Sequence, residues 1–173
     1  FSFENLDKIF VYNKSLSPIK SNLKAYKVLD TYIHENNFFI SYVLKKDDCT
    51  KFVISKSKLD STELKFEQFF KDDTCAKFIQ GGRMQSLKFN NVDGIIFSMA
   101  DNISDKATDQ PQSDKSNFGK IIFKGFESED SVIYSKGHRN PQGLYVDSDV
   151  ILSTEHGPKG ADEINKIQFN KNY

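Results

Sequence analysis

The chain has 173 residues, a length typical of one domain, and its 24 basic and 24 acidic side chains give a formal net charge of zero. This balance argues against a basic surface that binds nucleic acid. No stretch approaches the roughly 18 consecutive apolar residues of a membrane-spanning helix. Hydrophobic residues make up 38% of the chain, with 16 Phe and 7 Tyr, so the composition predicts a soluble, folded protein with a mainly aromatic core.

Short segments that are apolar, or that alternate between apolar and polar residues, recur along the whole chain. Polar turns separate them, which is the pattern of β-strands. We predict eleven strands, at residues 8–13, 37–44, 51–57, 63–70, 84–89, 94–100, 119–126, 131–135, 143–146, 150–154 and 164–169. This density leaves little room for helices, and the spacing favours a sandwich, a barrel or the blades of a propeller.

Three regions need separate interpretation. Residues 21–33 carry apolar side chains at helical spacing, but their aromatic and β-branched content favours a loop followed by a strand. Apolar and charged residues alternate in 63–70, which predicts one half-buried antiparallel strand. Residues 100–117 contain almost no apolar side chain and predict a long loop.

The two cysteines, Cys49 and Cys75, do not belong to a pair with metal-ligand spacing. Each follows an acidic turn, so the two could meet across neighbouring loops. A disulfide and two free thiols are both open, because the sequence does not give the Cα separation that decides between them. The chain begins with Phe1 and carries no basic segment followed by an apolar one, so we expect a processed piece of a longer protein.

Two blocks in the second half of the chain carry the clearest motifs. They read YSKGHRNPQGL at residues 134–144 and TEHGPKGADEIN at residues 154–165. Together with QGGRM at 80–84 and FGKII at 118–122, they resemble the signature of the glucose/sorbosone dehydrogenases, the soluble quinoprotein aldose dehydrogenases. The resemblance covers residues 28–173 and is strongest from residue 81 onward.

The resemblance implies an all-β fold, a six-bladed β-propeller with four-stranded antiparallel blades. At about 40 to 45 residues per blade, a chain of 173 residues supplies three to four blades. We therefore expect residues 1–173 to form a single partial propeller. Self-association or the missing blades would cover its open edges. We also expect a periplasmic or secreted protein with no nucleic-acid partner and no membrane span.

The same resemblance implies that pyrroloquinoline quinone (PQQ) and calcium are cofactors and that an aldose sugar is oxidised at C1. At the matched positions, Arg139 and Asn140 face the quinone. A guanidinium can bind a quinone carboxylate through two hydrogen bonds, and the Asn amide can bond a ring carbonyl. The alternative for Arg139 is a structural pair with Asp147 or Glu155.

Calcium is the second implied ligand, and by resemblance the main-chain carbonyls of Gly157 and Pro158 would bind it. Calcium prefers oxygen ligands and accepts those of the backbone. Without the flanking match, an ordinary turn rich in Gly and Pro would be the preferred interpretation. We expect Glu155, Asp162 and Glu163 to hold this loop through its amides and not to bind the metal.

One position departs from the family pattern in a way that affects catalysis. The family places a His, its general base, two residues ahead of the first small residue of the GGR strand, and this chain has Ile79 there. Isoleucine cannot accept a proton, and a general base contributes roughly 10² to 10⁴ in rate. We therefore assign no catalytic residue and expect weakened activity. The imidazoles nearby, His138 and His156, each have their own place in the motifs.

Two other readings compete with a dehydrogenase. The first is a non-catalytic module that binds a carbohydrate or a protein through loops such as 100–117. The second is a structural role in which the chain folds only by association of its open ends.

Overall fold

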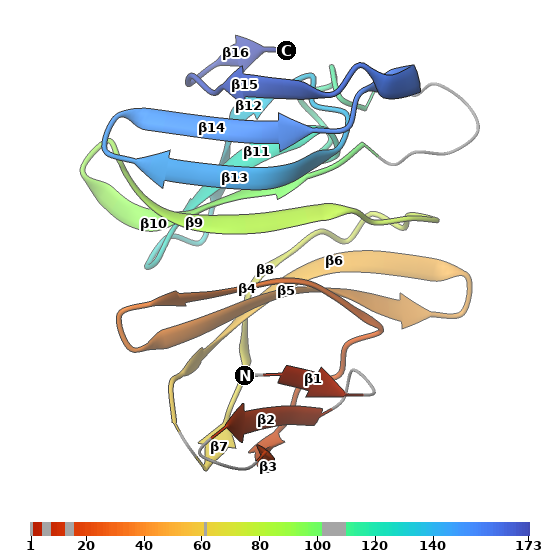
Figure 1. Cartoon of the computed structure of the whole chain (residues 1–173). Coiled ribbons are helices and arrows are strands. Elements are labelled where there is room, and N and C mark those ends of the chain that lie inside the picture. The colour runs from red at the N-terminus through yellow and green to blue at the C-terminus, as the bar shows by residue number, and fades with distance from the viewer. Residues whose placement is uncertain (1, 5–7, 13–15, 61, 102–109) are drawn as a thin grey trace. The chain divides into compact units, whose positions relative to one another are not determined.

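The computed structural model describes residues 2–4, 8–12, 16–60, 62–101 and 110–173. Within these residues the chain is all-β, with sixteen strands, one short 3-10 turn and no α-helix. The strands form four sheets, as Figure 1 shows. The all-β prediction is confirmed, and the largely antiparallel sheets are of the kind that form part of a propeller. No helix in the described part of the chain has the length and apolar content to cross a membrane.

Contacts divide the chain into two compact units, Phe1–Cys75 and Ala76–Tyr173. The strands of the first unit are β1 (Ser2–Glu4), β2 (Lys8–Tyr12), β3 (Leu16–Ser21), β4 (Lys27–His34), β5 (Asn37–Lys46), β6 (Cys49–Lys58), β7 (Glu63–Leu64) and β8 (Glu67–Lys71). They form two four-stranded sheets, in the orders β1-β2-β3-β7 and β4-β5-β6-β8. The loop and strand expected at 21–33 are confirmed by β4.

Strand β5 is one of the two inner, largely buried strands of the sheet β4-β5-β6-β8. Successive side chains of a strand point to opposite faces, yet Phe38, Phe39 and Ile40 are all buried. One face packs Phe38 and Ile40 into a cluster with Leu64. On the other, the ring of Phe39 lies edge-on to that of Phe69, with centroids 5.4 Å apart. Burial on both faces explains why this segment is a continuous apolar run.

The prediction of one antiparallel strand at 63–70 is wrong. The chain breaks after Leu64, so that β7 pairs in parallel with β3 while β8 pairs antiparallel with β6. The side chain of Asn22 explains the break, because it makes both hydrogen bonds of Phe66: the Phe66 amide donates to Oδ1 at 2.7 Å and the Phe66 carbonyl accepts from Nδ2 at 2.9 Å. A side chain thus replaces a strand partner between the two sheets.

A disulfide joins Cys49 and Cys75, whose Cα atoms are 5.2 Å apart. Cys49 begins β6 at the β5–β6 hairpin, and Cys75 is the last residue of the first unit. The bond therefore ties the end of this unit to its central hairpin. Asp73, two residues before Cys75, also contacts the same region through Lys51 at 2.9 Å.

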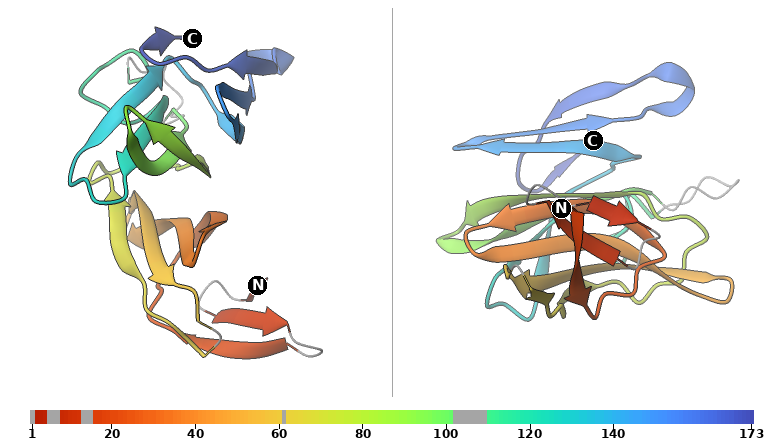
Figure 2. Two further views of the ribbon diagram at one scale, coloured as in Figure 1. Left: turned by 90° about the vertical axis from the view of Figure 1, so that its left-hand side faces the viewer. Right: turned by 60° about the horizontal axis from the view of Figure 1, so that its bottom comes forward.

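The strands of the second unit are β9 (Gly81–Phe89), β10 (Val92–Met99), β11 (Lys120–Gly125), β12 (Ser131–Lys136), β13 (Pro141–Asp147), β14 (Val150–Glu155), β15 (Glu163–Lys166) and β16 (Lys171–Asn172). One sheet has the order β16-β12-β11-β10-β9, and a second has the order β13-β14-β15. Figure 2 shows both from two further sides. Ile96, Ile121 and Ile151 share one buried cluster, so the core of this unit draws on both sheets.

Lys120 is buried at the start of β11, where it organises the loop before this strand. Its Nζ donates to the carbonyls of Gln110 at 2.7 Å, Pro111 at 3.0 Å and Phe118 at 2.9 Å. Burial lowers the pKa of Lys120 to about 8, so the ammonium remains protonated at neutral pH. Of the loop expected at 100–117, residues 102–109 lie outside the described residues, and 110–117 fold as turns beside this ammonium.

The loop held by Lys120 supports the segment that follows β12. The Gly137 amide donates to the Pro111 carbonyl at 3.0 Å, and the His138 amide donates to the Gly119 carbonyl at 3.1 Å. Gly137 has a φ of 87°, and a Cβ there would collide with the backbone of Tyr173. The backbone conformation within the first motif block is therefore fixed at Gly137.

Replacing Lys120 should destabilise this unit. The change Lys120→Met removes the ammonium from three carbonyls, of which those of Gln110 and Pro111 keep an amide donor, so we expect the free energy of unfolding to fall by about 2 kcal/mol. Urea unfolding followed by circular dichroism measures the change. Lys115→Met is the matched control, because Lys115 is exposed in the same loop, and it should shift stability by no more than about 0.5 kcal/mol. Equal stability of the two variants would contradict this role of Lys120.

Candidate functional site

The two motif blocks form neighbouring loops at one end of the β13–β14 pair. Residues 137–140 lead from β12 into β13, and residues 156–162 lead from β14 into β15. In the antiparallel register Pro141 lies opposite Glu155, so both loops leave the sheet at the same end. The His156 amide donates to the Asn140 carbonyl at 3.1 Å and extends the pairing. The structure thus brings together the loops that carry all four predicted ligand residues, Arg139, Asn140, Gly157 and Pro158.

The side chain of Arg139 bridges these loops. Its Nη1 donates to the carbonyls of His156 at 2.7 Å and Gly157 at 2.9 Å. In the described residues its partners are thus main-chain carbonyls and not the carboxylates of Asp147 or Glu155, which the structural alternative required. Its main chain is held separately, because the Arg139 carbonyl accepts from the Asp101 amide at 2.7 Å.

Asn140 is buried, and its side chain is oriented by a neighbour. The Asn140 Oδ1 accepts a hydrogen bond from Gln142 Nε2 at 2.6 Å. Gln142 is itself tied to β9, because its carbonyl accepts from Arg83 Nε at 2.7 Å. Strand β9, which carries the GGR motif, is therefore hydrogen-bonded to the residue that orients Asn140.

A buried hydrogen-bond network lies beneath the loops. His138 is fully buried, and its Nδ1 lies 2.5 Å from Glu155 Oε1 while its Nε2 lies 2.7 Å from Ser135 Oγ. The Glu155 carboxylate also accepts from Ser153 Oγ at 3.0 Å and Asn165 Nδ2 at 3.3 Å. One buried carboxylate thus connects the loop after β12 with strands β14 and β15.

Glu155 also holds the first loop directly, because its Oε2 accepts from the Arg139 amide at 3.2 Å. Burial alone would raise the pKa of Glu155. The hydrogen bond and charge of His138, together with the hydrogen bonds of Ser153 and Asn165, outweigh burial, so the pKa is lowered. The group is therefore ionised at neutral pH. A carboxylate in this state can accept every one of these hydrogen bonds.

The arrangement of Ser135, His138 and Glu155 has the hydrogen-bond order of a nucleophile, a base and an acid. All three are buried, and the exposed fraction of Ser135 is 1% and that of His138 is 0%. A substrate carbonyl would need to reach the Ser135 hydroxyl, which lies in the packed interior. The network therefore positions the two loops and does not perform hydrolysis.

The Gly157–Pro158 turn is compact and has its own hydrogen bonds. The Gly157 amide donates to Asp162 Oδ1 at 3.2 Å, and the Pro158 carbonyl accepts from the Ala161 amide at 3.3 Å. A Cβ at position 157 would collide with the Ala161 backbone, so the close approach requires glycine. The expectation that acidic residues hold this loop through its amides is confirmed for Asp162, whereas Glu155 holds the neighbouring loop and Glu163 bonds the side chain of Asn165.

Ile79, at the family's base position, is buried with an exposed fraction of 5%. The next residue, Gln80, accepts at its carbonyl from the Ala100 amide at 3.2 Å. Asp101, which follows Ala100, is the donor to the Arg139 carbonyl. The segment that carries Ile79 is therefore linked through the end of β10 to the Arg139 loop, but its side chain is apolar and cannot transfer a proton.

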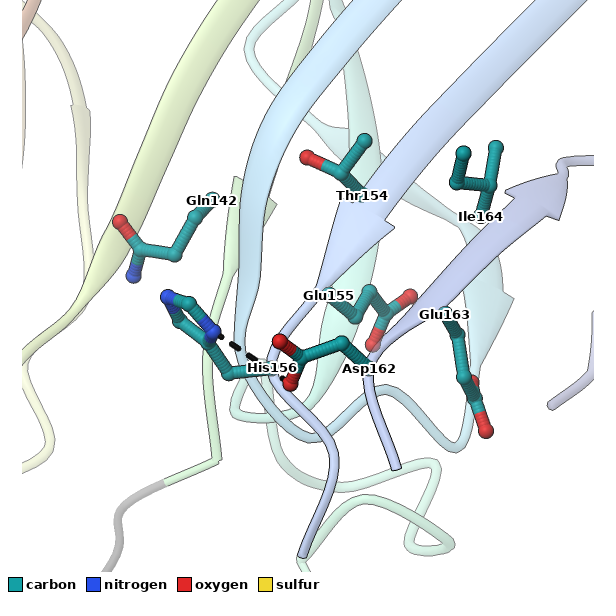
Figure 3. Close-up of a pocket in the computed structure, with 7 residues that line it drawn as sticks. All are labelled: Gln142, Thr154, Glu155, His156, Asp162, Glu163 and Ile164. Carbon is teal, nitrogen blue, oxygen red and sulfur yellow. Dashed lines mark ion pairs between the residues drawn. The ribbon is translucent and has the colours of Figure 1, made fainter. Parts of the chain in front are cut away.

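A hollow of about 350 Å³ lies beside the second loop. It is lined by Gln142, Thr154, Glu155, His156, Asp162, Glu163 and Ile164, as Figure 3 shows. His156 and Asp162 point toward one another there, with Nδ1 and Oδ1 3.5 Å apart. Both side chains are largely exposed, in contrast to His138. His156 is thus the accessible imidazole of the described part of this unit.

A calcium ion does not fit the loop in the arrangement described. Calcium takes about six to eight oxygen ligands, whereas the Gly157 carbonyl already faces the Arg139 guanidinium at 2.9 Å. The Pro158 carbonyl is bonded within its own turn. In the described part of the chain, no group of three or more His, Cys, Asp or Glu side chains is arranged to hold a metal ion.

The sequence model of the glucose/sorbosone dehydrogenase family matches residues 20–173, so the chain belongs to this family. Two relatives match shorter segments. Uncharacterized protein slr1608 of Synechocystis sp. is 38% identical over 79 residues, which cover 37% of this chain and 19% of the relative. Aldose sugar dehydrogenase YliI of Escherichia coli is 51% identical over 43 residues, which cover 24% of this chain and 12% of the relative. The chain thus matches a fifth or less of the length of these relatives.

The sequence motifs located the two loops but missed the network that holds them. His138 stands one residue before Arg139 in the first motif block, and Glu155 stands two residues before Gly157 in the second; this similar placement is the signal that could have paired them. Ser135 and Ser153 gave no signal of their own. Lys120 stands in the FGKII element, which gives no indication of its contacts with three loop carbonyls.

The lowered pKa of Glu155 makes a prediction for the pH dependence of stability. Because the folded pKa is below the ordinary value of 4.5, Glu155 stabilises the fold above that value, and the contribution is lost as pH falls through the folded pKa. Glu155→Gln should lose about 2 kcal/mol at pH 7 and should show a smaller further loss below pH about 4.5 than the wild type. Urea unfolding at a series of pH values measures both effects.

The control for this experiment is Glu127→Gln, because Glu127 is exposed in the turn after β11. This variant should follow the wild-type pH profile. A profile for Glu155→Gln that runs parallel to the wild type below pH about 4.5 would show that Glu155 is not the group responsible.

Proposed function

We propose that the protein works as an aldose dehydrogenase of its family, oxidises the sugar at its anomeric carbon, and depends on PQQ and calcium. Family membership and the similarity to an aldose sugar dehydrogenase support the reaction class. The observation that carries the proposal is the meeting of the Arg139–Asn140 loop and the Gly157–Pro158 loop at one end of the β13–β14 pair. In this proposal, Arg139 and Asn140 bind the quinone. Gly157 and Pro158 are the metal ligands that the family resemblance implies, and their carbonyls would have to give up their present hydrogen bonds to bind an ion.

The proposed reaction is slow in this chain because of Ile79. Oxidation of a sugar hydroxyl at C1 requires that the hydroxyl proton be removed, and the buried isoleucine cannot accept it. His138 cannot replace it, because both of its ring nitrogens are occupied by Ser135 and Glu155 in the interior. The accessible imidazole, that of His156, lies on the loop between β14 and β15, where it faces Asp162.

An exported location, periplasmic or secreted, is part of the same proposal. The Cys49–Cys75 disulfide supports it, because disulfides persist mainly in oxidising compartments. Cys75 is exposed, so the thiols of a reducing compartment could reach the disulfide and reduce it.

A non-catalytic sugar-binding module is the second candidate. It is favoured by the apolar side chain at position 79 and by the engagement of Arg139 with main-chain carbonyls. The hollow beside His156, whose lining includes the side chains of Gln142, Thr154 and Asp162, would then be a site for sugar hydroxyl groups.

The activity of the full chain with PQQ and calcium tests the proposal. We expect slow, aldose-dependent reduction of an electron-accepting dye by the wild type. Ile79→His restores a proton acceptor and should raise turnover by about 10²-fold or more. Ile79→Asn is the matched control, because it introduces a polar side chain without a base, and it should leave turnover at the wild-type value or below.

Two results would count against the proposal. Rapid turnover by the wild type would show that Ile79 does not limit the reaction. Sugar binding measured by calorimetry without PQQ, combined with no turnover in any variant, would favour the non-catalytic module.

A further inference from the structure

Strand β15 forms one edge of the sheet β13-β14-β15, and within the described residues no strand pairs with its outer side. Just past β15, the Ile167 amide donates to the carbonyl of Ile151 in β14 at 2.8 Å. Residues of an antiparallel pair alternate between facing their partner strand and facing away from it, so the main-chain groups of Ile164 and Lys166 point away from β14. β15 thus presents hydrogen-bond donors and acceptors at an edge that no described strand covers.

The side chains along this edge are complementary to themselves. Ile164 has an exposed fraction of 76%, the highest among the large apolar side chains of the described residues. Asp162 and Lys166 stand two positions before and after it, so strand periodicity places all three on the same face. In an antiparallel pair of two such edges related by a two-fold axis at Ile164, each isoleucine lies opposite its counterpart and each Asp162 lies opposite a Lys166.

Other positions of the axis are less favourable. An axis at Lys166 or Glu163 would set two like charges directly opposite each other, which destabilises a strand pair. An axis at Asn165 would need the Lys166 carbonyl as an acceptor at the centre, but the Tyr173 hydroxyl already donates to it. With the axis at Ile164, the two copies of this residue exchange amide-to-carbonyl hydrogen bonds in both directions.

The face beside this edge suits a sheet that continues into a second copy. Exposed apolar side chains lie on the same face of each strand: Tyr145 on β13, Val150 on β14 and Ile164 on β15. Figure 3 shows Ile164 on the strand next to Thr154, its partner in the register. A two-fold axis perpendicular to the sheet keeps this face on one side, so the exposed faces of two copies would join without a step.

We propose that β15 is a self-association edge, to which a second copy of this chain adds its own β15 in antiparallel orientation about a two-fold axis at Ile164. The contact joins two three-stranded sheets into one continuous sheet. Each strand contributes four residues, which is far less than a standard interface of about 1,600 Å², so the dimer is weak and forms only at high concentration. The inference is separate from the proposed function, because none of these contacts involves a cofactor or a sugar.

Sedimentation of the full chain over a concentration series is the first test. The wild type should show a monomer–dimer equilibrium with a dissociation constant between about 10 μM and 1 mM. Ile164→Lys sets two ammonium groups opposite each other at the axis and should weaken dimerisation at least about tenfold. Val150→Lys is the matched control: it makes the same kind of change on the same exposed face, but on the inner strand β14, and it should dimerise as the wild type does.

Two results of this experiment would overturn the proposal. The first is a wild type that stays monomeric up to about 1 mM. The second is equal weakening by Ile164→Lys and Val150→Lys, because sheets that stack through their faces, and are not joined at their edges, would give that result.

A mixing experiment tests the register. Lys166→Glu leaves a carboxylate opposite Asp162 of the second copy, and Asp162→Lys leaves an ammonium opposite Lys166. Each variant alone should dimerise at least about tenfold more weakly than the wild type at low salt. An equimolar mixture should recover association at the wild-type level, because every acidic group then faces a basic one. A mixture that associates no better than the single variants would contradict the register.

Cross-linking supplies a readout that requires no change of charge at the flanks. Ile164→Cys places two thiols across the axis, where the Cα atoms of a hydrogen-bonded antiparallel pair are about 5.5 Å apart, within the reach of a disulfide. Mild oxidation should link most of this variant into dimers. Lys166→Cys is the control, because its two copies would lie about 14 Å apart along the strands and should not be linked. Failure to link Ile164→Cys, or equal linking of both variants, would refute the proposed pairing.

Discussion

The contact between His138 and Glu155 is the interaction on which the loop cluster depends. Both side chains are buried, and they join residues that precede the two ligand segments of the sequence motifs. An ionised carboxylate in the interior is costly unless its oxygens are bonded, and the oxygens of Glu155 accept from four different residues. Separating these groups would leave a buried charge without its partners, and this penalty keeps the two loops together.

Cationic side chains of this unit also donate hydrogen bonds to loop carbonyls that have no strand partner. Lys120 bonds three carbonyls around the loop before β11, and Lys124 bonds the carbonyls of Ser128 and Glu129 in the turn that follows it. Arg139 does the same for His156 and Gly157. These side chains supply hydrogen-bond donors to loop carbonyls that the strand ladders do not reach. At Arg139, this structural role meets a position that the family resemblance assigns to cofactor binding.

Much of the fold could be predicted from the sequence, because its strands are short, apolar and separated by polar turns. The segment 37–44 is an example, since its apolar run marks a strand buried on both faces. The segment 63–70 could not be predicted, because its alternation is that of one strand while the Asn22 side chain, 44 residues from Phe66 in sequence, divides it between two sheets. The two loops of the site could be predicted from their motifs. The hydrogen-bond partners of Arg139 could not be predicted, because contacts between a side chain and a distant carbonyl leave no pattern in the sequence.

The coupling between His138 and Glu155 tests this account most directly. A double-mutant cycle with His138→Gln, Glu155→Gln and the double variant gives their interaction free energy from urea unfolding at pH 7. The account predicts a coupling of about 1 kcal/mol or more, because the two side chains share one buried hydrogen bond. Additive effects of the two substitutions would contradict it, since the loops would then be held together by other contacts.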